Sequence, residues 1–275
     1  MKVQEVQYVQ ENAQEVHDVQ QGVSIVKIYV IANQKGGIGK TTTATALTSI
    51  LSSRGHNSLL IDADMQCNST DAYRAKFEGE STLYDVLFDT DEIQDAIQHT
   101  ENGDIVPGDP LLREAEVKFG SDISLVGVLR KKLRRLEGYD YVIIDTAPNL
   151  GNLLFSCLLA ADSVIVPVTA DRFALQGLSQ LKESIDKVNE VFEKEVPIEG
   201  FLLVMHNERT NLSKEIKSIL KESTEAFSTK LFQTTIRESI KAREAQAVRE
   251  NLIVYAPHST TAIDYRSFVD ELMGE

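Results

Sequence analysis

One glycine-rich segment, Asn33–Thr42, constrains the fold of this chain more than any other part of the sequence. It reads Asn-Gln-Lys-Gly-Gly-Ile-Gly-Lys-Thr-Thr and stands between the apolar segment Ile25–Ala32 and the helical run Thr43–Ser53. Its glycines permit the backbone to curl so that successive N–H groups point at phosphate oxygens, and a following helix adds the partial positive charge of its N-terminus. The sequence therefore predicts a phosphate-binding loop between a strand and a helix.

The side chains of this loop indicate which ligand it takes. Lys40 is placed to reach the β and γ phosphates of a nucleotide, and the Thr41 hydroxyl is placed to ligate Mg²⁺. ATP and Mg²⁺ are therefore the predicted cofactors. The predicted nucleotide contacts within the loop are Gly36, Gly37, Ile38, Gly39, Lys40, Thr41 and Thr42.

Apolar, β-rich segments alternate with helical stretches along the rest of the chain. These segments are Ile25–Ala32, Ser58–Ile61, Asp104–Val106, Tyr141–Ile144, Ser163–Val168, Gly200–Met205 and Leu231–Thr234. Continuous apolar strands separated by helices indicate a mostly parallel, twisted sheet with helices on both faces. We therefore predict an α/β fold of the P-loop NTPase class. No internal repeat or low-complexity linker divides residues 23–275, so one ATPase domain is expected there.

Residues 1–22 follow another pattern and form a predicted N-terminal extension. Small apolar residues recur every three or four positions, and Gly22 follows the last of them. This spacing predicts an amphipathic helix that ends at the glycine. Valine, a mediocre helix former, dominates the apolar stripe, so the helix is expected to need a surface, either on the main domain or on another subunit or partner.

Two predicted strands end in carboxylates, at the edge of the sheet where ligands of such folds bind. Asp62 and Asp64 stand two residues apart after one strand, so both are expected to reach the same side, near the Mg²⁺ and the γ phosphate. Asp145 ends another apolar strand at the Walker B position, where a carboxylate can hold Mg²⁺ through water. Thr41, Asp64 and Asp145 are therefore the predicted metal-site residues.

The loop carries a second lysine, Lys35, where the general phosphate-loop pattern accepts any residue. The string Lys-Gly-Gly-Ile-Gly-Lys-Thr-Thr resembles the deviant Walker A loop of the family that includes the ParA and Soj partition ATPases, MinD and nitrogenase iron protein. The resemblance implies a homodimer that sandwiches the nucleotide, in which Lys35 crosses to the phosphates of the other subunit. A solvated loop lysine is the alternative. Lys35 and Lys40 are the predicted catalytic lysines.

Two further segments resemble the same family. Asp62–Thr70 is similar to its DxDPQxN(A/S)T motif, with Met65 in place of the proline. This similarity implies that Asp64 positions the attacking water and that the first aspartate of the segment organises the loop. Asp145–Pro148 is similar to the DxxP form that partition ATPases carry. Altogether the resemblance runs from about residue 25 to residue 273.

Two later segments are similar to parts of the family that contact the nucleoside. Val166–Leu178 is similar to the family segment VPxxxExxALxGL, and Asp171 stands where glutamate is usual, which implies a shorter carboxylate toward the ribose. Met205–Thr210 is similar to the stretch that lines the adenine, where Asn207 supplies both a donor and an acceptor. The alternative for Asn207 is an ordinary turn residue.

Features outside these motifs separate the members of that family. Membrane-positioning members end in a basic amphipathic helix, whereas this chain ends in the acidic Phe268–Glu275, and no apolar run approaches the roughly 18 residues of a membrane span. Iron–sulfur reductases need two cysteines at set places in each subunit, and Cys67 and Cys157 do not match that arrangement. A DNA partition ATPase remains, expected in the cytoplasm and on the nucleoid, without membrane contact.

DNA binding has to overcome the charge of the chain, because 28 Lys and Arg against 42 Asp and Glu give a net charge of −14. Local basic patches are therefore needed. Lys214, Lys217 and Lys221 fall on one face of a predicted helix, and Arg237, Lys241 and Arg243 follow further on. The resemblance implies that such residues of the dimer hold non-specific double-stranded DNA, while solvated helix faces are the alternative.

The resemblance implies a complete partition cycle. A centromere-bound, ParB-like adaptor stimulates the weak ATPase activity of the DNA-bound dimer and releases it from DNA. Too few residues precede the first strand for a helix-turn-helix domain, so we expect no sequence-specific operator binding. The alternative function is that of a small-molecule ATP-dependent synthetase or a reductase-type member on the same scaffold, which needs a substrate pocket rather than a DNA face.

Overall fold

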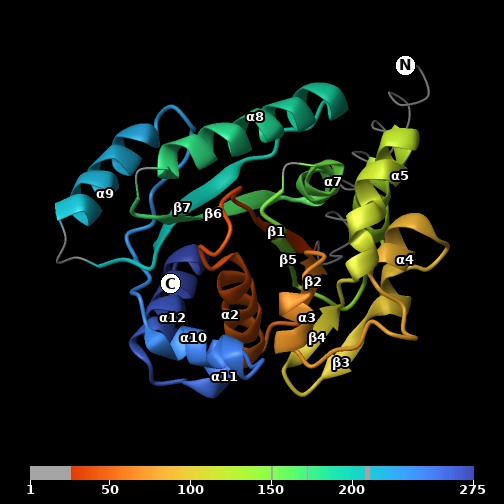
Figure 1. Ribbon diagram of the computed structural model, residues 1–275, viewed down its shortest axis with the longest axis horizontal. Helices are drawn as coiled ribbons and strands as arrows, with labels where there is room; N and C mark the ends of the chain where they lie inside the picture. Colours follow the sequence, from red (N-terminus) through yellow and green to blue (C-terminus); the bar gives the residue numbers. More distant parts are fainter. Residues whose placement is uncertain (1–25, 150, 172, 208–210) are drawn as a thin grey trace.

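The structure is a computed structural model that describes residues 26–149, 151–171, 173–207 and 211–275. The amphipathic helix predicted for residues 1–22 lies outside these residues. The described part forms one seven-stranded sheet with helices on both faces (Figure 1), which is the α/β architecture predicted from the sequence. None of its described helices is long and apolar enough to cross a membrane.

The sheet has the strand order β3-β4-β2-β5-β1-β6-β7, and every neighbouring pair is parallel except β3 and β4. Its strands are β1 (Lys27–Ile31), β2 (Ser58–Ala63), β3 (Gln98–Thr100), β4 (Gly103–Val106), β5 (Tyr141–Thr146), β6 (Ser163–Thr169) and β7 (Ile198–Val204). Successive side chains of a strand point to opposite faces. Leu59 and Ile61 of β2 accordingly enter one hydrophobic core, and Leu60 enters the other.

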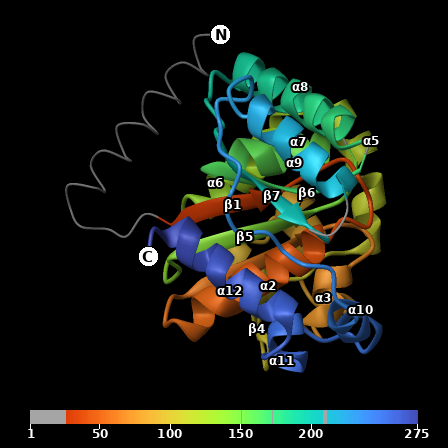
Figure 2. The same cartoon turned by 90° about the vertical axis from the view of Figure 1, so that its left-hand side faces the viewer.

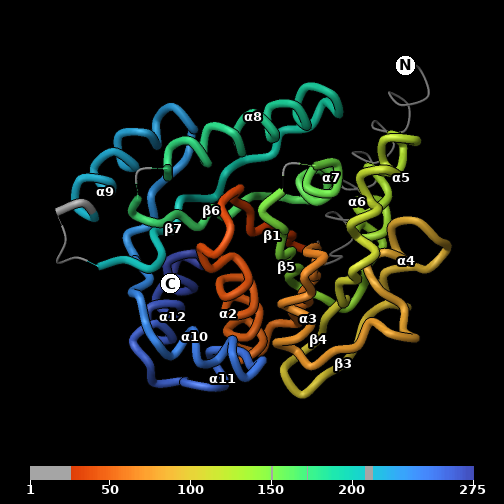
Figure 3. Tube along the Cα trace, in the orientation of Figure 1, coloured from red at the N-terminus to blue at the C-terminus, as the bar shows by residue number. Residues whose placement is uncertain are grey.

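The helices form two layers around the sheet, as Figures 1 and 3 show. On one face lie α2 (Lys40–Ser53), α10 (Ile240–Ala247), α11 (Leu252–Tyr255) and α12 (Thr260–Met273). On the other lie α4 (Leu83–Phe88), α5 (Ala115–Ser121), α6 (Val128–Leu133), α7 (Asn152–Ala160), α8 (Ala174–Phe192) and α9 (Asn211–Ser223). The short α3 (Asn68–Ala72) follows β2. Three 3₁₀ turns, η1 (Ile93–Ala96), η2 (Pro110–Glu114) and η3 (Ile123–Gly127), complete the described part of the chain.

Two details of the predicted strands were wrong. The segment Leu231–Thr234 is no strand: it runs beside β7 with scattered hydrogen bonds and one isolated bridge, between Phe201 and Leu231. Its Phe232 ring packs over Gly200, where an added Cβ would lie 2.4 Å from the ring, so the apolar pattern reflects burial rather than strand pairing. The edge strand β3 was not predicted because its Gln-His-Thr sequence carries no apolar signal.

The C-terminal helices hold α2, the helix that follows the glycine-rich loop. Figure 2 shows α12 beside α2, where the Thr43 hydroxyl and the Tyr265 hydroxyl are 3.0 Å apart in the core. The buried Asn251 side chain donates to the Thr45 carbonyl at 3.0 Å. Buried hydrogen bonds of this kind fix orientation as well as contributing stability. The start of α2 is thus held firmly at the carboxyl edge of the sheet.

Candidate active site

The glycine-rich loop forms the turn that its sequence predicts. Gly37 and Gly39 have φ angles of 72° and 84°, which glycine adopts without strain, and α2 begins directly at Lys40. No side chain of the described residues caps this helix start, and its first turn carries no acidic residue. The free N–H groups and the positive end of the helix therefore remain available for an anion such as phosphate.

Lys40 lies inside this loop with its side chain folded over it. It is 6% exposed, and its ammonium donates to the Lys35 carbonyl at 2.9 Å. Burial lowers the pKa of Lys40, and the nearby carboxylates of Asp145 and Asp64 oppose that shift. A phosphate group entering the loop would find a cation that is already in place.

The carboxylates predicted for the site do lie together at the ends of β2 and β5. Asp62 and Asp145 are direct neighbours across these two strands, and both are fully buried. Burial raises the pKa of Asp145 well above its usual range, although the hydroxyls of Thr41 and Ser69 act in the opposite direction. The Ser69 hydroxyl donates to one Asp145 oxygen, Oδ2, at 2.8 Å.

The other Asp145 oxygen, Oδ1, is buried and has no hydrogen-bond partner among the described residues. An orphaned carboxylate oxygen beside the Thr41 hydroxyl suits Mg²⁺, which prefers oxygen ligands and keeps several waters. No group of three or more His, Cys, Asp or Glu in the described part of the chain forms a ready metal cage. This fits a cation held by one or two protein oxygens together with the phosphates of a nucleotide, rather than a cation held by protein alone.

Asp62 and Asp64 have different surroundings. Asp62 accepts hydrogen bonds from the Thr70 amide at 2.8 Å, from the Thr70 hydroxyl at 2.7 Å and from the Asp64 amide at 3.1 Å. Asp64 is 7% exposed and accepts one bond, from the Gln66 amide at 3.0 Å. Asp62 is therefore saturated by its own loop, whereas Asp64 retains acceptor capacity toward the phosphate loop.

Lys35 contacts its own subunit. Its ammonium forms an ion pair with Asp171 and donates to the Thr169 hydroxyl at 3.2 Å, both at the carboxyl end of β6. Burial acts to raise the pKa of Asp171, but the hydrogen bonds from Lys35 and Thr169 outweigh it and lower that pKa. The sequence assigned Lys35 to the other subunit and Asp171 to the ribose. The structure brings the two side chains together.

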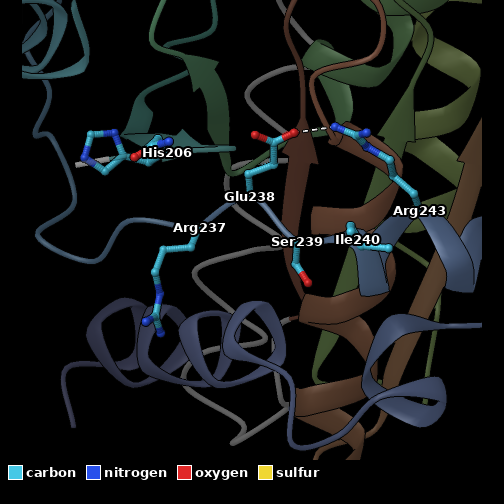
Figure 4. Close-up of a pocket in the computed structure, with 7 residues that line it drawn as sticks. His206, Arg237, Glu238, Ser239, Ile240 and Arg243 are labelled. Atoms are coloured by element: carbon cyan, nitrogen blue, oxygen red, sulfur yellow. Dashed lines mark hydrogen bonds and ion pairs between the residues drawn. The ribbon is translucent and has the colours of Figure 1, made fainter. Parts of the chain in front are cut away.

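A cavity of about 480 Å³ opens beyond the end of β7 (Figure 4). Its lining residues are His206, Asn207, Arg237, Glu238, Ser239, Ile240 and Arg243. Asn207, the candidate adenine contact, thus shares a cavity with two residues assigned to DNA from the sequence. Arg237 turns toward α12 and pairs with Asp264 at 2.6 Å, while Arg243 pairs with Glu238.

The remaining predicted DNA-binding residues lie on two helices. Lys214 and Lys221 of α9 are exposed, Lys217 is half-buried, and none of the three forms an ion pair within the described part of the chain. Lys241 of α10 pairs with Glu244 at 2.7 Å. Among the predicted DNA-binding residues, the three lysines of α9 are therefore those whose charge no described carboxylate pairs with.

Three residues that bond the predicted site residues were not themselves predicted from the sequence. Ser69, which bonds Asp145 across 76 positions, stands at the Ala/Ser position of the resembled motif, so that motif was its available signal. Thr169 and Asp264, the partners of Lys35 and Arg237, carry no motif signal.

Together, the fold and the loop define the class of protein: a P-loop nucleoside triphosphatase with a second lysine in its phosphate loop. A family profile described as an AAA domain matches residues 26–198. The sporulation initiation inhibitor protein Soj of Bacillus subtilis is 37% identical over 250 residues, covering 90% of this chain and 98% of Soj. The chromosome partitioning protein ParA of Myxococcus xanthus is 34% identical over 91% of this chain and 89% of its own length.

A solved structure agrees with the fold. Cobyrinic acid a,c-diamide synthase from Mycobacterium smegmatis, with a bound ATP analogue and magnesium, has a TM-score of 0.77 at 26% identity, covering 90% of this chain and 95% of the synthase. The chain belongs to the ParA/Soj family of P-loop ATPases. The family and the fold class predicted from the sequence are thereby confirmed.

Proposed function

We propose that this protein is a DNA partition ATPase, which binds non-specific double-stranded DNA as an ATP-sandwiched homodimer and leaves the DNA after hydrolysis. The observation that carries the proposal is the joint placement of Lys35, Lys40, Asp64 and Asp145 around one phosphate loop. Membership of a family that contains a chromosome partitioning protein supports the partition role. Nucleoid association follows from the DNA binding.

Each residue of the site has a separate task in this cycle. The loop N–H groups and Lys40 hold the β and γ phosphates. Thr41 and Asp145 hold Mg²⁺, which compensates phosphate charge when it is bound. Asp64 orients the attacking water, because it keeps spare acceptor capacity and is more exposed than Asp62 and Asp145. A ParB-like, centromere-bound adaptor stimulates a weak intrinsic hydrolysis.

The alternative, a small-molecule synthetase, shares this scaffold, as the cobyrinic acid synthase shows. Such an enzyme needs a substrate cavity beside the phosphates. The cavity near Asn207 is the one we assign to the adenine, and a second cavity, of about 590 Å³, lies beside the edge strand β3 around Tyr73 and His99. The uncompensated lysines of α9 favour the DNA-binding function.

Charge reversal on α9 tests this function. Lys214→Glu, Lys217→Glu and Lys221→Glu together are expected to weaken duplex binding at least tenfold at low salt, because these lysines neutralise phosphates and release counterions. Reversal at Arg237 and Lys241 is expected to have a smaller effect, since both cations already face carboxylates. Gel shifts across a salt series, with ATP, ADP and no nucleotide, measure both effects.

The DNA binding of the unmodified protein is the reference for these gel-shift measurements. We expect its DNA binding to need ATP, because pairing two subunits doubles the basic surface, and to be indifferent to base sequence. Lys76→Glu, an exposed lysine near the opposite edge of the sheet, serves as the matched control and should bind DNA normally. DNA binding that ignores nucleotide, or an ATPase rate that duplex DNA leaves unchanged, would favour the synthetase function.

The Lys35→Ala variant tests the sandwich dimer. We expect it to bind ATP as a monomer but to lose ATP-driven dimerisation and turnover, because the missing charge belongs to the other subunit's site. Light scattering with and without ATP measures the dimer, and Lys187→Ala on the exposed side of α8 is the control. Normal dimerisation of Lys35→Ala would mean that the pairing of Lys35 with Asp171 is its whole role.

A further inference from the structure

Helix α7 begins without a cap of its own. Its N-cap is Gly151, which has no side chain to accept hydrogen bonds from the first turn. The carboxylate of Glu116, on α5, takes that place: Oε2 accepts from the Asn152 amide at 2.9 Å, and Oε1 accepts from the Leu153 amide at 3.2 Å. The N–H groups of a first helical turn need such partners, and a negative charge there suits the helix dipole.

Gly151 leaves the space that this carboxylate occupies. A Cβ added to Gly151 would lie 1.9 Å from Glu116 Oε1, well inside contact distance. The backbone at Gly151 has φ −87° and ψ −175°, which other residues adopt without strain. Glycine is therefore needed at position 151 because Glu116 approaches so closely, whereas the backbone dihedral angles there would suit other residues.

The helix start that Glu116 holds is joined directly to the active site. β5 carries Asp145 and ends at Thr146, whose hydroxyl donates to the Ile31 carbonyl at 2.8 Å. Two residues further on, the Pro148 ring lies 3.9 Å from the position of a Cβ on Gly36, in the phosphate loop. Pro148 thus lies beside the phosphate loop, and Glu116 holds the helix start that follows a few residues later.

We infer that Glu116 is a positioning residue for ATP hydrolysis: it fixes the start of α7 and, through it, Pro148, which lies beside the phosphate loop after Asp145. This inference rests on the proposed ATPase function. Glu116 stands 29 positions before Asp145 in sequence and belongs to no motif identified from the sequence. Its action passes through main-chain N–H groups of α7 rather than through the nucleotide.

The test uses the full-length chain and four variants. Glu116→Gln keeps the size of the side chain but offers one good acceptor instead of two, and Glu116→Ala removes both. Gly151→Ala displaces the carboxylate from the other side. Glu114→Gln, which changes an exposed glutamate two residues before Glu116, is the matched control.

We expect kcat for ATP to fall about fivefold in Glu116→Gln and about tenfold in Glu116→Ala, with KM and ADP affinity within about twofold of the parent. Hydrogen exchange at the Asn152 and Leu153 amides should accelerate in both variants. Gly151→Ala should reproduce the loss, yet add nothing in the Glu116→Ala background, because both changes remove the same contact. The control should match the parent.

Several results would overturn the inference. Glu116 variants with a lower melting temperature but the parent kcat would make the contact merely structural. Additive losses in the double variant, or unchanged exchange at the two amides, would remove the link between Glu116 and Gly151. A parent chain that hydrolyses no ATP would overturn the proposed function instead, and the hydrogen-exchange comparison would still decide whether Glu116 holds α7.

Discussion

Replacing Lys40 with alanine is expected to abolish stable ATP binding. The Lys40 ammonium is the buried cation of the phosphate loop, 6% exposed and held over the loop by the Lys35 carbonyl. Without it the β and γ phosphates would enter a site that also contains Asp62 and Asp145, with the loop N–H groups as their main compensation. We expect the affinity to fall at least a hundredfold, roughly 3 kcal/mol.

Titration calorimetry with ATP and Mg²⁺ measures this loss. Lys187→Ala, which removes an exposed lysine from α8, should bind ATP like the parent. Circular dichroism checks that Lys40→Ala still folds. An ATP affinity of Lys40→Ala close to that of the parent would show that the loop does not bind the phosphates in the way we propose.

Asp64→Ala is expected to separate binding from hydrolysis. The side chain accepts one hydrogen bond, from the Gln66 amide, and faces Lys40 and Asp145, so its loss leaves the phosphate loop intact. General-base or water-orienting groups contribute about 10²–10⁴-fold to enzyme rates. We therefore expect kcat to fall at least a hundredfold while ATP affinity stays within a few-fold of the parent.

The product of that variant is expected to be a persistent ATP dimer that stays on DNA. Phosphate release measures the rate, and calorimetry measures the affinity in the same preparation. Asp186→Asn on α8, an exposed aspartate paired with Lys182, is the control. If Asp64→Ala hydrolyses ATP at the parent rate, another residue orients the attacking water.

The parts of the molecule that were predictable from the sequence are those whose signal is local. The phosphate loop and the carboxylates after β2 and β5 each belong to a motif of a few consecutive residues, and the apolar segments around these motifs predict the strands. β3 was missed because three polar residues give no periodic signal. Leu231–Thr234 was predicted as a strand because of its apolar residues. These residues are apolar because the segment is partly buried beside β7, where it forms no continuous ladder of hydrogen bonds.

The pairings within the site could not be predicted, because they join polar residues far apart in the chain. Lys35 meets Asp171 across 136 positions, and Arg237 meets Asp264 across 27. No spacing rule links such residues. Arg237 was assigned to DNA for its charge, yet the charge is already matched by a carboxylate that the sequence leaves undistinguished within α12.

Helix α7 has a consequence for the order in which this protein folds. Glu116 accepts from the amides at its start, and the Lys194 ammonium donates to the Leu159 carbonyl at 2.6 Å at its end, so side chains of other elements bond both ends. A nine-residue helix is marginal in isolation, and this one has no side-chain cap from its own N-cap residue. Because these side chains lie about 35 residues away on either side, we expect α7 to become stable only after α5 and the end of α8 have docked. A chain in which these elements have not yet docked is therefore expected to bind a nucleoside triphosphate poorly, because the helix start that follows Asp145 still lacks Glu116.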